Sequence, residues 1–153
     1  QLKDRPLYLR GTLLRQKLES IMDHVDCSVA IFVNRGFTQA SYILLLVDNE
    51  DDLFLFNYAR TRLGEQSMTI RICFINEQVD KQLESKIIND FVQIDPKKFV
   101  LDKPLTMNTF IENKETLLVM SYTTCKKLSK DQELFTKLPS LLIIRPKQLK
   151  IAN

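Results

Sequence analysis

The sequence has little of the residue types that many catalytic and cofactor sites require. It contains only three glycines, which cannot supply a Walker loop or a dinucleotide-binding fingerprint. His24 is its only histidine, so a zinc site and a Ser-His-Asp triad both lack support. The three cysteines, Cys27, Cys73 and Cys125, have no metal-ligand spacing and an odd count. We therefore expect reduced thiols, no metal and no enzymatic activity.

Long apolar runs and massed charge are also missing. The longest aliphatic run, Ile43–Val47, is far shorter than the about 20 apolar residues that a membrane-spanning helix needs. The net charge is only +3, from 22 cationic and 19 anionic residues. The densest cationic stretch, Lys126–Lys130, is followed at once by Asp131 and Glu133, which is typical of a solvated helix face. We predict no nucleic-acid partner.

Apolar periodicity predicts strands that alternate with helices along most of the 153 residues. The expected strands are Cys27–Val33, Tyr42–Val47, Met68–Phe74, Phe99–Leu101, Thr116–Met120 and Leu141–Ile144. The expected helices are 12–24, 53–63, 78–92, a helix starting at Asp102 and Pro104, and a loose helix over 127–138. This order predicts an α/β fold: an open, mostly parallel five-stranded sheet with helices on both faces, plus an extra N-terminal helix and edge strand.

Ligands of such sheets bind beyond the carboxyl ends of the strands, where the strand order reverses. The loop after Val47 holds three aspartates. They could bind a ribose hydroxyl or a cation, but we favour the interpretation that they form a helix N-cap. The loop after Met120 has hydroxyl groups that could bind a phosphate. The alternative interpretation is a polar loop between a strand and a helix. The candidate ligand-binding residues are Asp48, Asp51, Asp52, Ser121 and Thr123.

Two segments resemble known families. Val47–Asp52, followed by Ala59 and Arg60, resembles the first strand and helix of the universal stress protein superfamily, whose aspartate helps to hold an adenine nucleotide. The segment Cys27–Gly36, CSVAIFVNRG, is similar to the CSVAILVDRG-type segment in the cytosolic tails of plant CHX-type and fungal endomembrane cation/proton antiporters. In that family an adjacent aspartate pair follows the next strand, and Asp51–Asp52 matches it.

The sequence also departs from these families. Compared with the antiporter tails, Asn34 replaces the usual aspartate, Asp48–Glu50 replaces a glycine pair, and Ser121 replaces the usual glycine after the fourth strand. The Gly-x-x-Gly that nucleotide-binding stress proteins have in this last loop is also missing. An adenine nucleotide is therefore the one candidate cofactor that the resemblance implies, and we expect none to be bound.

The resemblance implies a cytosolic regulatory domain of a monovalent cation/proton antiporter, with potassium as the expected ion. It would lie on the cytosolic face of an endomembrane such as the Golgi. Its partners would be the transmembrane part of the same polypeptide, a second copy or a small-molecule ligand. The chain starts with Gln1, and we expect 1–36 to end a preceding half-domain, with 37–153 forming a stress-protein-like domain. Cys27–Val33 should pair with Leu141–Ile144, in antiparallel direction. The alternative is a free-standing nucleotide-binding protein of the stress-protein type.

Overall fold

The computed structural model describes residues 12–36, 42–62, 68–76, 78–101 and 115–147. The strands are β1 (Val29–Val33), β2 (Tyr42–Val47), β3 (Ile70–Phe74), β4 (Phe99–Leu101), β5 (Thr116–Ser121) and β6 (Ser140–Arg145). The α-helices are α1 (Thr12–His24), α2 (Phe54–Arg62), α3 (Lys81–Ile87), α5 (Tyr122–Leu128) and α6 (Gln132–Lys137). A 3-10 turn, η2 (Glu50–Leu53), precedes α2, and a π turn, η3 (Ile88–Val92), follows α3.

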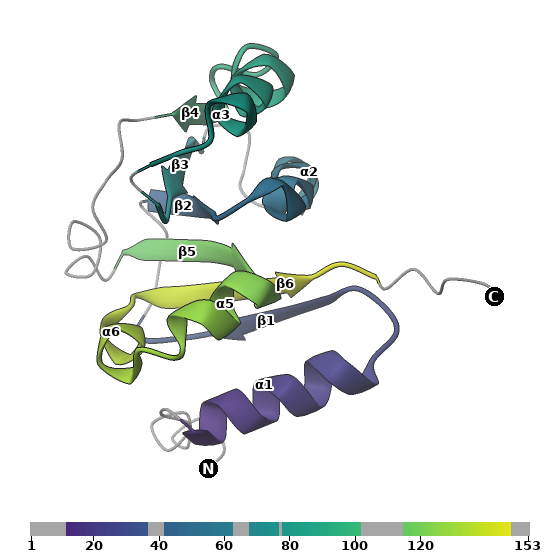
Figure 1. Cartoon of the computed structure of the whole chain (residues 1–153), viewed down its shortest axis with the longest axis vertical. Coiled ribbons are helices and arrows are strands. Elements are labelled where there is room, and N and C mark those ends of the chain that lie inside the picture. The colour runs from purple at the N-terminus through teal and green to yellow at the C-terminus, as the bar shows by residue number, and fades with distance from the viewer. Residues whose placement is uncertain (1–11, 37–41, 63–67, 77, 102–114, 148–153) are drawn as a thin grey trace.

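All six strands form one open sheet in the order β1-β6-β5-β2-β3-β4 (Figure 1). The five strands β2 to β6 are parallel, and β1 runs antiparallel beside β6 with Ile31 opposite Ile143. The predicted fold class, an open and mostly parallel α/β sheet with an added edge strand, is thus confirmed. The antiparallel pairing that the resemblance implied for the Cys27–Val33 segment is confirmed as well.

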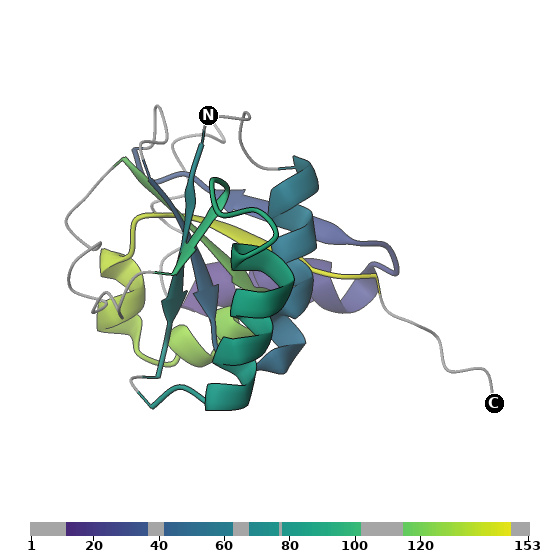
Figure 2. The same cartoon turned by 90° about the horizontal axis from the view of Figure 1, so that it is seen from above.

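Successive residues of the central strands point to opposite faces of the sheet, so each strand feeds two cores. From β2, Leu44 and Leu46 join the core under α1, α5 and α6, whereas Ile43, Leu45 and Val47 join the core under α2, α3 and η3. Figure 2 shows α2 and α3 on one side of the sheet, with α5 and α6 on the other. Burial on both faces explains why the run from Ile43 to Val47 is uniformly apolar.

Two arginines fasten the N-terminal elements to the rest of the sheet. The guanidinium of Arg145, at the end of β6, donates to the carbonyl of Met22, which lies in the last turn of α1. It also donates to the carbonyls of Val25 and Cys27, which follow the helix. The guanidinium of Arg35, just after β1, donates to the carbonyls of Phe135 (2.5 Å) and Leu138 (2.8 Å). The described residues 12–36 therefore share one sheet and one core with the remainder. That they end a preceding half-domain stays a prediction.

Three expectations about the helices need correction or fall outside the described residues. The loose helix over 127–138 is wrong: Ser121 caps α5 directly at the end of β5, and Asp131 caps a separate α6. The helix over 78–92 begins later, because Asp80 caps it, and it changes to a π turn at Ile88. The helix expected to start at Asp102 and Pro104 lies outside the described residues.

Candidate functional site

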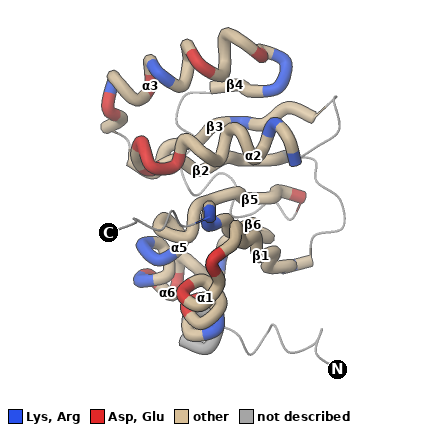
Figure 3. The backbone as a smooth tube through the Cα atoms, turned by 90° about the vertical axis from the view of Figure 1, so that its right-hand side faces the viewer, with Lys and Arg blue, Asp and Glu red and all other residues tan. Residues whose placement is uncertain are grey.

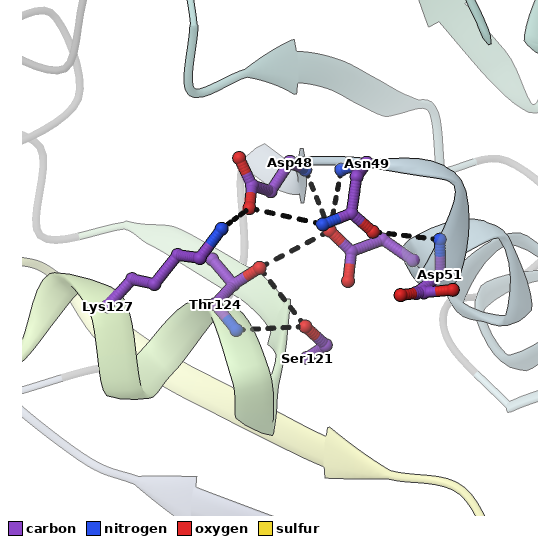
Figure 4. A network of polar contacts seen from close by, with 7 residues as sticks. Asp48, Asn49, Asp51, Ser121, Thr124 and Lys127 are labelled. Carbon is purple, nitrogen blue, oxygen red and sulfur yellow. Dashed lines mark hydrogen bonds and ion pairs between the residues drawn. The ribbon is translucent and has the colours of Figure 1, made fainter.

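The strand order reverses between β2 and β5. The chain leaves β2 for β3 on one side, through α2, and it leaves β5 for β6 on the other side, through α5. The loop after β2 and the start of α5 therefore diverge at the carboxyl ends of two neighbouring parallel strands, which is where ligands bind in open α/β sheets. Polar side chains from both segments meet at this point (Figure 4).

Asp52 is the centre of these contacts, and its residue surface is only 2% exposed. Its Oδ2 atom accepts hydrogen bonds from the backbone N–H groups of Asp48 (2.7 Å) and Asn49 (3.4 Å). The Asn49 side chain in turn accepts from the N–H of Asp51 at 2.9 Å, which completes a capping box around η2. The predicted N-cap role of this acidic loop is therefore confirmed, with Asn49 as the capping residue.

A chain of hydroxyl groups connects β5 to the same carboxylate. Ser121 caps α5 by accepting the N–H of Thr124 at 3.1 Å, and its hydroxyl donates to Thr124 Oγ1 at 3.1 Å. The Thr124 hydroxyl then donates to Asp52 Oδ2 at 3.3 Å. Because Ser121 and Thr124 are both buried, this chain of hydroxyl groups connects the start of α5 to the loop after β2 with little competition from water.

Asp48 makes the second connection across the reversal point. Its carboxylate forms an ion pair with the Lys127 ammonium, and it also accepts from the Asn49 side chain at 3.3 Å. The side chain of Asp48 is 10% exposed and that of Lys127 is 55% exposed. The hydrogen bond from Lys127 to Asp48 and the charge of that carboxylate raise the pKa of Lys127, with a smaller contribution from Asp52.

The five predicted site residues therefore divide into two groups. Asp48, Asp52 and Ser121 come together at the reversal point, whereas Asp51 and Thr123 are exposed to solvent. Two participants, Thr124 and Lys127, are not among the predicted site residues: Thr124 precedes the helix expected from 127, and Lys127 belongs to a stretch interpreted as a solvated helix face. The available signal was a serine directly after an apolar strand, because serine is a preferred N-cap residue.

Burial raises the pKa of Cys73 to about 11 and that of Cys125 to about 12, so both groups are protonated thiols at neutral pH. A ligand that bound Asp48 Oδ2 would compete with the Lys127 ammonium for this oxygen. Groups that can do so are other cations or hydroxyl donors such as a sugar diol.

The fold and this site define an α/β open-sheet domain whose strand-order reversal point is occupied by its own polar side chains. Comparisons with protein-family models, with curated proteins and with solved structures found no match. Among the described residues, no helix has both the length and the apolar character needed to cross a membrane. Those residues also contain no cluster of metal-ligating side chains.

Proposed function

We propose that this chain is a cytosolic regulatory domain of a membrane-bound monovalent cation/proton antiporter, with potassium as the exchanged ion. The domain would neither transport ions nor catalyse a reaction. It would bind the transmembrane part of the same polypeptide, a second copy or a small ligand. Regulation requires that this partner have different affinities for two states of the transporter.

The observation that carries the proposal is the set of contacts that residues of the CSVAIFVNRG segment make in the structure. Val29, Ile31 and Val33 pack against the core under α1, α5 and α6. Arg35 holds the end of α6, and Gly36 adopts a φ of 92°, which favours glycine. Several residues of the segment that resembles the antiporter tails thus have defined structural roles, and this supports the proposal that the segment is a structural element as in those tails.

The antiporter proposal is tested on the endogenous protein. An antibody raised against the domain is used on membrane and soluble fractions of cells, separated on a denaturing gel. We expect a membrane-bound band much larger than the 17.9 kDa of this chain, resistant to carbonate extraction and enriched in Golgi fractions. A soluble band near 17.9 kDa would refute the proposal. Comparison of cation flux with and without the domain then gives the direction of regulation.

The alternative, a nucleotide-binding protein of the stress-protein type, is favoured by one observation: Asp48 follows β2 at the strand-order reversal point, where such a ligand would bind. It is tested by thermal unfolding of the purified chain with ATP. Saturation at 100 times the dissociation constant adds about 2.7 kcal/mol to the free energy of unfolding. We expect no shift, because Ser121 and its Cβ stand where a glycine would admit the phosphate.

A further inference from the structure

Ile94 is the most exposed large apolar side chain in the described part of the chain, at 69%. It lies in the turn between η3 and β4, and the backbone of this turn is held by hydrogen bonds. The N–H of Asp95 donates to the carbonyl of Phe91, and the N–H groups of Lys98 and Phe99 both donate to the carbonyl of Asp95, each at 3.0 Å. The exposure of Ile94 is therefore a property of an ordered turn.

Cations surround this turn from two elements. Lys97 is exposed in the turn itself, and the Thr69 hydroxyl donates to its carbonyl at 3.2 Å. Arg60, in the last turn of α2, lies over the rings of Phe91 and Phe99, at 5.6 and 5.7 Å from their centroids. Because these rings flank the turn, the end of α2 lies next to it.

Arg62, two residues after Arg60, is the last residue of α2 and is exposed. We call the surface of Arg60, Arg62, Ile94 and Lys97 the α2–β4 corner. Figure 3 shows basic residues gathered at the end of α2 and in the turn before β4, while the acidic η2 lies at the opposite end of α2. The corner also includes one acid, the half-buried Asp95. Its net charge is therefore positive.

We propose that the α2–β4 corner docks on an anionic lipid surface, with Ile94 entering the headgroup region and the three cations contacting phosphates. A cluster of cations alone would fit any polyanion. An isoleucine exposed among the cations stabilises binding only where its side chain leaves water, as it does at the boundary between headgroups and acyl chains. The acidic end of α2 would then face away from the membrane. This proposal does not depend on the antiporter assignment.

The experiment is cosedimentation of the full chain with phosphatidylcholine vesicles, with and without phosphatidylserine, at low and high salt. Each cation near an anionic surface strengthens binding by about fivefold, so Arg62→Gln with Lys97→Gln should weaken it by about 25-fold. Ile94→Ser should weaken it by about tenfold, because the transfer of an apolar side chain is lost. Arg60 is left in place, since it packs on two core rings.

Matched controls lie on the other side of the molecule. Lys17→Gln with Lys130→Gln removes the same charge from exposed positions, and Ile21→Ser removes a comparable side chain that is 45% exposed on α1. We expect these variants to bind phosphatidylserine vesicles as the unchanged chain does. All variants are first checked for an unchanged circular dichroism spectrum and unfolding temperature, so that a loss of binding is not a loss of folding.

Three results would overturn the proposal. One is failure of the unchanged chain to sediment with phosphatidylserine vesicles. This result would overturn the proposal even if the same cations bound a single-stranded oligonucleotide. Another is equal weakening by the corner and control charge pairs, which would reflect net charge alone. The third is binding that Ile94→Ser leaves unchanged and that soluble glycerophosphoserine releases, because the ligand would then be a free phosphate. Salt-sensitive binding lost only in the corner variants would support lipid docking.

Discussion

Replacing Asp52 with alanine tests the structural role of the strand-order reversal point. The substitution removes the acceptor of three donors, namely the N–H groups of Asp48 and Asn49 and the hydroxyl of Thr124. A hydrogen bond to a charged group contributes about 1.5–3 kcal/mol, and the bond from Asn49, at 3.4 Å, is too long to contribute fully. Because Asn49 is half-exposed, its N–H can bond to solvent instead, and we expect a total loss of about 3 kcal/mol in the free energy of unfolding.

Urea unfolding followed by circular dichroism measures this loss, and thermal unfolding should show a decrease of about 6–12 °C for a chain of this size. Asp51→Ala is the matched control, since it removes an exposed carboxylate from the same turn and should change stability by less than about 0.5 kcal/mol. A double-mutant cycle with Thr124→Val isolates the Thr124–Asp52 contact, with an expected coupling of about 1 kcal/mol. Equal effects of Asp51→Ala and Asp52→Ala would refute the reasoning.

Three further predictions concern charge and thiols. The raised pKa of Lys127 means that its stabilising contribution is complete below its unfolded pKa, about 10.4, and is lost as pH rises through the folded value. Lys127→Met should therefore flatten the alkaline part of the stability profile, as followed by urea unfolding at each pH. Arg145→Met should lower the free energy of unfolding by about 3–5 kcal/mol in urea unfolding, because the carbonyls of Met22, Val25 and Cys27 lose a charged hydrogen-bond donor. Mass spectrometry after iodoacetamide treatment should find Cys27 alkylated in the folded protein, whereas Cys73 and Cys125 should react only after unfolding.

The architecture was largely predictable, because local periodicity reflects burial. A strand buried on both faces must be apolar at every position, as Ile43–Val47 is, and an amphipathic helix must repeat its apolar residues, as 12–24 does. Errors concentrated at helix boundaries. Apolar periodicity predicts the start of α5 five residues late. The true start is set by the cap at Ser121, which depends on where β5 ends and not on any apolar pattern.

The sequence by itself determined the α/β alternation, the position of the sheet's carboxyl edge and the presence of an acidic capping loop on that edge. Only the tertiary structure distinguished Asp52 from Asp51: these neighbours are chemically identical, yet one is buried against Thr124 and the other faces water. It also brought Lys127 to Asp48, 79 residues away in the chain. Such contacts depend on how β2 and β5 align side by side, and this alignment follows from the packing of two cores that local patterns do not encode.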